Sequence, residues 1–174
     1  MKARALGLIE ESNLIQILRH GRLECYVKKS PTYNPYYPGE KYDWEFELSF
    51  RQYRFTDSYR GFNPYSGVEY IFENGNPTPL WSCDYVGYAD IKLGVNVKEI
   101  YGFLKKARGN HMNHNSQSLF DSYSMSEGDF DYVSNFSGNL AGLLQIEEIT
   151  HRGILVCRQV TSGRLSQRID IPPG

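Results

Sequence analysis

A two-residue alternation of apolar and polar side chains, present in two separate stretches of the chain, constrains the fold most strongly. In the first stretch Trp44, Phe46 and Leu48 alternate with acidic and hydroxyl residues. This period is typical of a strand that buries one face. Strands are predicted within 44–60 and at 68–72, 80–86, 130–136, 143–149 and 154–160. Asn74-Gly75 is a strong hairpin signal between two of them.

Two other segments have helical spacing. Apolar residues at intervals of three and four predict helices over 6–20 and 96–108. Asn96 can cap the second helix at its start. Gly21 and Gly109 are expected to end the two helices, because glycine is favoured just past a helix C-terminus.

The segments between these elements are expected to be loops. Residues 30–43 contain three prolines and four tyrosines, and proline cannot continue a helix or a central strand. We expect this loop to pack on the surface of the domain. Residues 110–128 are mostly polar, and the length of this stretch makes it a candidate for function or disorder.

A short pattern recurs along the chain. The residues Glu69, Ile71 and Gly75 recur as Glu147, Ile149 and Gly153, each 78 positions later. This recurrence predicts an internal duplication covering about 44–92 and about 128–165. The predicted fold class is α+β, with an antiparallel sheet or sheets built from two related β-rich halves and two helices. All 174 residues are expected to form a single domain.

Composition excludes several classes of function. The net charge of −1 and the absence of long Lys or Arg runs argue against direct nucleic-acid or membrane binding. No apolar stretch approaches the roughly 20 residues needed to cross a bilayer. The cysteines Cys25, Cys83 and Cys157 are odd in number and far apart, which favours reduced thiols in a cytoplasmic protein. No cofactor is predicted, and the sequence leaves the oligomeric state open.

Several short motifs resemble a known family. They are Thr56-Asp57-Ser58-Tyr59-Arg60-Gly61, Gly67-Val68-Glu69, Pro79-Leu80-Trp81, Asp84-Tyr85-Val86-Gly87, Phe103-Leu104-Lys105-Lys106-Ala107, Gly138 and Glu147-Glu148-Ile149. Together they resemble a bacterial domain of unknown function that often follows an XRE-type helix-turn-helix in transcriptional regulators. The resemblance covers roughly residues 10–165, and Gln145 stands where the family pattern has glycine. It implies a stand-alone sensor or partner-binding module and supplies no activity.

Two kinds of catalytic or metal site are weighed against structural roles. His111 and His114 are three residues apart, but zinc usually needs three or four ligands, so solvated loop histidines are favoured. Asp57, Glu69 and Glu147 lie in predicted strands. If the two halves face one another, Glu69 and Glu147 could lie near a pseudo-twofold axis, and paired carboxylates can do acid–base chemistry. Structural carboxylates, bonded to a turn or paired with Arg54 or Arg60, are the favoured interpretation. No catalytic or metal-binding residue is therefore predicted.

The remaining candidate is an aromatic binding site. Aromatic residues make up 14% of the chain, and tyrosine suits both β cores and pocket walls. Trp81, Tyr59 and Tyr85 are predicted to form one cluster, with Arg54 and Glu69 at its polar edge, where stacking and an arginine can hold a planar ligand. The indole N–H of Trp81 is expected to find a partner there.

The predicted function is a non-enzymatic module that binds a nucleotide-like or other planar small molecule, or a protein partner. A hydrolase or lyase that uses paired carboxylates is the first alternative. A phage or mobile-element protein that sequesters a signalling nucleotide is the second.

Overall fold

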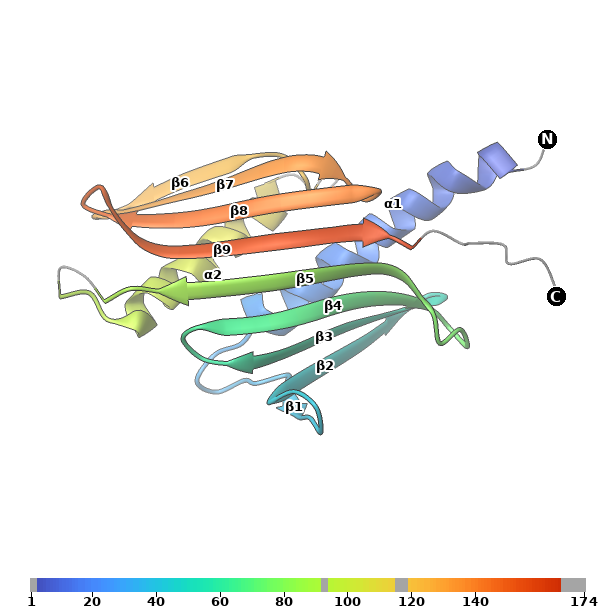
Figure 1. The fold of residues 1–174 in the computed structure, drawn as a ribbon, viewed down its shortest axis with the longest axis horizontal. Helices are drawn as coiled ribbons and strands as arrows, with labels where there is room; N and C mark the ends of the chain where they lie inside the picture. Colours follow the sequence, from blue (N-terminus) through green and yellow to red (C-terminus); the bar gives the residue numbers. More distant parts are fainter. Residues whose placement is uncertain (1–2, 92–93, 115–118, 167–174) are drawn as a thin grey trace.

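The structure, a computed structural model, describes residues 3–91, 94–114 and 119–166. Within these residues it has two α-helices, α1 (Ala3–Arg22) and α2 (Val97–His114), and a π-helical turn, η1 (Leu23–Val27). The strands are β1 (Tyr37–Pro38), β2 (Trp44–Phe50), β3 (Tyr53–Gly61), β4 (Tyr65–Glu73), β5 (Pro79–Ala89), β6 (Tyr123–Glu127), β7 (Phe130–Asn139), β8 (Gly142–His151) and β9 (Ile154–Leu165). They form one antiparallel sheet in the order β1-β2-β3-β4-β5-β9-β8-β7-β6 (Figure 1). The predicted α+β class is confirmed.

The sheet consists of two four-strand meanders that meet at β5 and β9. We call α1, η1 and β2–β5 the first half, and α2 and β6–β9 the second half. Asp84 of β5 pairs with Ser162 of β9, and these two positions are also 78 residues apart (162 − 84). The spacing of the sequence repeat therefore matches a pseudo-twofold axis through this pair. The duplication itself stays a prediction.

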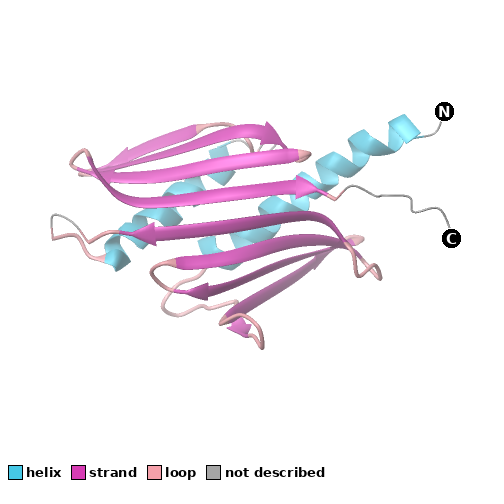
Figure 2. Cartoon of the chain, viewed as in Figure 1, coloured by secondary structure: helices cyan, strands magenta, loops and turns pink. Residues whose placement is uncertain are grey.

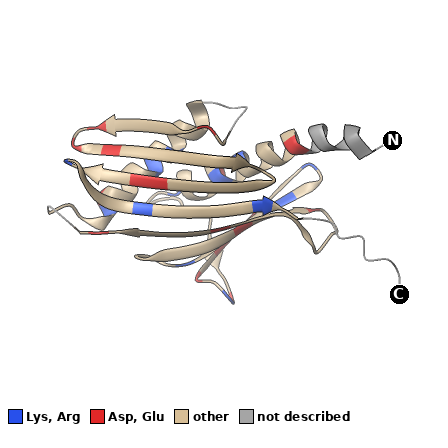
Figure 3. Ribbon diagram, turned by 45° about the horizontal axis from the view of Figure 1, so that its top comes forward, with Lys and Arg blue, Asp and Glu red and all other residues tan. Residues whose placement is uncertain are grey.

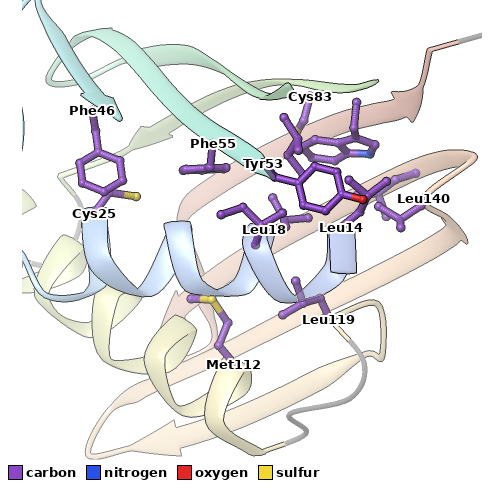
Figure 4. Packing of buried hydrophobic residues seen from close by; sticks show 14 of the residues in the cluster. Leu14, Leu18, Cys25, Phe46, Tyr53, Phe55, Cys83, Met112, Leu119 and Leu140 are labelled. Atoms are coloured by element: carbon purple, nitrogen blue, oxygen red, sulfur yellow. The ribbon is translucent and has the colours of Figure 1, made fainter. Parts of the chain in front are cut away.

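Both helices cover the same face of the sheet (Figure 2). The helices lie side by side, with α1 packed on β2, β3 and β4 and α2 on β5, β6 and β7. Leu18 of α1 faces Phe55 of β3, while Met112 of α2 lies on the opposite side of α1 (Figure 4). Neither helix is long and apolar enough to cross a membrane, among the residues that were described.

The two glycines predicted to end the helices lie inside them, and that prediction is wrong. A Cβ on Gly21 would come within 2.3 Å of the Phe55 ring, and α1 runs on to Arg22. A Cβ on Gly109 would come within 3.1 Å of a Val27 methyl group, and α2 runs on to His114. Both glycines are needed because another element packs directly against the helix backbone, not because a helix stops there.

Two predicted loops contain more structure than expected. Residues 110–128 contain the last turn of α2 and the edge strand β6; residues 115–118 of this stretch lie outside the described part. Residues 30–43 include β1 and pack closely enough to bury Tyr36. The predicted cap of α2 is confirmed, because the side-chain oxygen of Asn96 accepts a hydrogen bond from the Glu99 amide at 2.9 Å.

Candidate functional site

A cavity of about 520 Å³ lies between the helix-covered face of the sheet and the helical elements. Residues from both halves line it, including side chains from η1, β3, β4, β5, α2, β8 and β9. Six tyrosines contribute to the wall: Tyr26, Tyr36, Tyr59, Tyr65, Tyr85 and Tyr101. This volume is within the range of small-molecule sites.

The first half supplies one buried ion pair. Arg22, at the end of α1, donates Nε to both oxygens of Glu69 on β4 at 3.0 and 3.1 Å, and Nη2 to Oε2 at 2.7 Å. Both side chains are almost fully buried. The bidentate geometry compensates two charges that would otherwise be costly to remove from water. We call Arg22–Glu69 the first ion pair.

The second half supplies the matching pair. Arg108 of α2 donates Nε and Nη2 to the two oxygens of Glu147 on β8, at 2.8 and 2.7 Å. Tyr132 and Gln159 donate to the same carboxylate at 2.6 and 3.0 Å. Burial opposes ionisation of Glu147, but the charge and hydrogen bonds of Arg108, with the Tyr132 bond, outweigh it and lower the pKa of Glu147. We call Arg108–Glu147 the second ion pair.

Tyr26 of η1 lies between the two ion pairs. Its ring is 5.1 Å from the guanidinium carbon of Arg108. Burial raises the pKa of Tyr26, while the charges of Arg22 and Arg108 oppose that rise. The π-helical turn thus places one phenol against both halves of the site.

Asp57 on β3 is a third buried carboxyl group in the cavity wall. Tyr36 and Tyr85 donate hydrogen bonds to its two oxygens at 2.6 and 2.7 Å. Asp57 is directly opposite Glu69 in the β3–β4 register. Burial, and then the negative charge of Glu69, raise the pKa of Asp57 to about 7, although the two phenols partly oppose the rise. Asp57 therefore titrates near neutral pH, whereas the pKa of Glu147 is lowered.

The sheet places Tyr85 by a close cross-strand approach. Gly67 is opposite Tyr85 in the β4–β5 register, and a Cβ on Gly67 would lie 2.3 Å from the Tyr85 hydroxyl oxygen. The hydroxyl end of the phenol thus occupies the space over the glycine, from where it donates to Asp57. Any larger residue at position 67 would displace this phenol.

The structure brings together three of the five predicted binding residues. Tyr59, Glu69 and Tyr85 line the cavity. Trp81 shares a strand face with Tyr85 but is fully buried in the hydrophobic core. Its indole N–H has no hydrogen-bond partner among the described residues, so the predicted bond to a carboxylate is not formed.

Arg54 lies away from the predicted cluster. Side chains alternate along β3, so Arg54 is on the face opposite to Asp57. There it donates to Glu47 at 3.0 Å and stacks over the Phe72 ring at 4.5 Å. The expectation that Arg54 forms the polar edge of the site is wrong, since the period of two that placed its neighbours inside places it outside.

Glu69 and Glu147 are each paired with an arginine, as the favoured structural interpretation expected, but the arginines are not the expected ones. Both glutamates line the same cavity, and their arginines come from the helices and not from β3. Arg60, the other expected partner, donates to the carbonyl oxygen of Lys41. The sequence did not indicate Arg22 and Arg108 as partners, because both are distant in sequence from the strands that carry the two glutamates. An arginine beside a glycine in each helix was the available signal.

The histidine pair has ring and backbone partners. The His111 ring stacks on Tyr123 with centroids 4.8 Å apart, and its Nε2 is 2.9 Å from the carbonyl oxygen of Asp121. Burial lowers the pKa of His111. Across the described part of the chain, no three His, Cys, Asp or Glu side chains are grouped closely enough to hold a metal ion.

Fold and site define an α+β protein with an aromatic cavity that contains two Arg–Glu pairs. The chain belongs to the family described as a domain of unknown function (DUF5680), whose model matches residues 57–165. Both glutamates of the ion pairs and Arg108 lie in the matched segment, whereas Arg22 and Tyr36 precede it. No curated protein and no solved structure matches the chain.

Proposed function

We propose that this protein binds a small planar molecule in the cavity between its sheet and its helices. The observation that carries the proposal is the composition of the wall: six tyrosines together with two internally compensated ion pairs, around about 520 Å³. Phenol rings offer faces for stacking and hydroxyl groups for orientation. Because each arginine is paired with a glutamate, the two ion pairs make the wall polar and leave neither partner unpaired.

Gly102 of α2 allows a direct test. It lines the cavity, and a Cβ there would have no atom within 4 Å. Gly102→Trp should fill the open space while the protein stays folded, and Gly102→Ala is the matched control. A thermal-shift screen of nucleotides and metabolites should give hits with the wild type and Gly102→Ala, because a bound ligand raises the melting temperature by mass action.

The same hits should disappear in Gly102→Trp. Hits that persist in that variant would place binding elsewhere on the molecule. A flat response of the wild type across the whole library would reject small-molecule binding and favour a protein partner.

A hydrolase or lyase is the second candidate, because a carboxyl group with a pKa of about 7 suits acid–base catalysis. Asp57→Asn distinguishes the two functions. A binding module keeps its ligand-dependent thermal shift in this variant, whereas an enzyme binds substrate and loses turnover.

The resemblance to domains that follow an XRE-type helix-turn-helix adds a context to the proposal. A cavity of this kind suits an effector-binding module whose ligand changes the behaviour of a partner protein. The bound molecule would then be a signal and not a substrate.

A further inference from the structure

Three lysines at the rim of the cavity have charges that no carboxylate balances. Lys29, Lys98 and Lys105 all line the cavity, and we call them the rim lysines. Among the residues that the structure describes, no carboxylate oxygen lies within ion-pair distance of any of the three. Neighbouring Lys106, which points away from the cavity, is by contrast paired with Glu127.

The rim lysines come from α2 and from the loop that follows η1. Lys98 and Lys105 are seven residues apart on α2, which is close to two helical turns, so they share a face of the helix. Lys105 Nζ donates to the backbone carbonyl of Lys29. Lys29 Nζ donates to the Tyr59 hydroxyl group at 2.8 Å and lies 5.3 Å from the Tyr36 ring centroid. Lys98 is exposed, and the other two are half-buried.

The charges deeper in the cavity are compensated. Each ion pair joins one arginine to one glutamate. Both oxygens of Asp57 accept phenol hydrogen bonds. Figure 3 shows that basic and acidic positions alternate over the strands and that the helices behind them also have basic positions. Among the residues that the structure describes, five basic side chains and three carboxyl groups line the cavity. They give it a positive excess of two even when Asp57 is ionised, and this excess lies at the rim.

We propose that the ligand carries an anionic group on a planar ring, with the anion held by the rim lysines and the ring inside among the tyrosines. This inference rests on the proposed function and specifies its ligand class. An ammonium group is a compact donor that suits carboxylate, phosphate and sulfonate groups. An anion at the rim also keeps partial contact with water, which avoids the cost of burying it.

Two fluorescent probes with the same rings test this inference. Anilinonaphthalene sulfonate is anionic, and N-phenyl-naphthylamine is its neutral counterpart. Wild-type protein should bind the anionic probe about tenfold more tightly, which corresponds to about 1.4 kcal/mol. Lys98→Gln and Lys105→Gln should each weaken binding of the anionic probe severalfold and leave the affinity for the neutral probe unchanged. Lys106→Gln, one position along the same helix, should change neither.

The outcomes separate the two proposals. Equal affinity for both probes, or equal effects of Lys98→Gln and Lys106→Gln, would overturn the anionic ligand and leave cavity binding intact. Anionic-probe binding that survives in Gly102→Trp would place the anion outside the cavity and also overturn it. If neither probe binds the wild type, both proposals are rejected.

Discussion

The two halves of the molecule place a glutamate at matching positions, pair it with an arginine from a helix, and then surround the pair differently. In the first half, Asp57 lies opposite Glu69, and the two carboxyl groups crowd one another. At the matching position of the second half, 77 residues later, stands Ser134, which accepts a hydrogen bond from Gln145 at 3.0 Å. One scaffold thus carries a carboxyl group that titrates near neutrality and, in the other half, a carboxylate that stays ionised.

At two further pairs of matching positions, the two halves also carry different residues. Phe55 of the first half corresponds to Tyr132 of the second (132 − 55 is 77), and the Tyr132 hydroxyl group supports Glu147. Trp81 corresponds to Gln159 (159 − 81 is 78), and Gln159 also donates to Glu147. The first half therefore fills these positions with apolar core, and the second half uses them to hold its carboxylate.

The largest change in the free energy of unfolding is expected at a position where the first half is stabilised by packing alone. Trp81→Ala should lower the free energy of unfolding by about 3–5 kcal/mol, because the ring is fully buried. Gln159→Ala, at the matching position, removes hydrogen bonds and should cost about 1–2 kcal/mol. Urea denaturation measures both. Equal costs would show that the two halves are not stabilised in these different ways.

The next largest change in the free energy of unfolding is expected at the second ion pair. Glu147→Gln leaves Arg108 buried without a counter-charge and should cost about 3 kcal/mol. The double variant Arg108→Met, Glu147→Leu removes both charges and should recover much of that loss. Strictly additive costs in this double-mutant cycle would mean that the two side chains do not interact as the structure shows.

Asp57 should give the protein a distinctive pH dependence. Its folded-state pKa of about 7 exceeds the value of about 4 for an unfolded chain. The stabilising contribution is therefore complete below about pH 4 and is lost as pH rises through 7. The slope can reach about 1.4 kcal/mol per pH unit in this window. Glu147, whose pKa is lowered, acts in the opposite sense and loses its contribution only as pH falls through the acidic range.

Asp57→Asn should remove the loss of stability between pH 5 and 7, measured by denaturation at several pH values. Ser134→Ala, at the matching position of the second half, should leave the slope unchanged. A slope that persists in Asp57→Asn would assign it to another group and remove the contrast between the halves.

The smallest effect is expected outside the cavity. Arg54→Ala breaks a partly exposed pair with Glu47 and should cost less than about 1 kcal/mol. Binding of the anionic probe should not change, because Arg54 lies on the uncovered face of the sheet. Weaker probe binding in this variant would place the site on that face.

Local patterns predicted most of the fold. The alternation in 44–60 and the helical spacing in 96–108 both correspond to observed elements. The strand β6 was missed, since its sequence is largely polar and it pairs at the sheet edge. Gly21 and Gly109 were wrongly predicted to end the helices, because glycine is also favoured where a side chain packs directly on a helix backbone. Only the tertiary structure shows that contact.

The site was less predictable than the fold, for a physical reason. Strand periodicity identified the face that carries Asp57, Glu69 and Tyr85, but it contains no information about which helix covers that face. Arg22 and Tyr36 reach the cavity from segments whose position depends on packing against β2, β3 and β4. The residues that compensate the buried charges could therefore not be assigned from spacing alone.

The pairing of β5 with β9 also has a consequence for how the chain folds. Within each half, short turns join successive strands, so most contacts form between residues close in sequence. The β5–β9 register joins Trp81 to Leu165 and Ala89 to Cys157, separations of 84 and 68 residues. Closing such long loops costs entropy before any contact forms, and distant pairing slows folding. We expect the two meanders to form first and their meeting at β5 and β9 to set the folding rate.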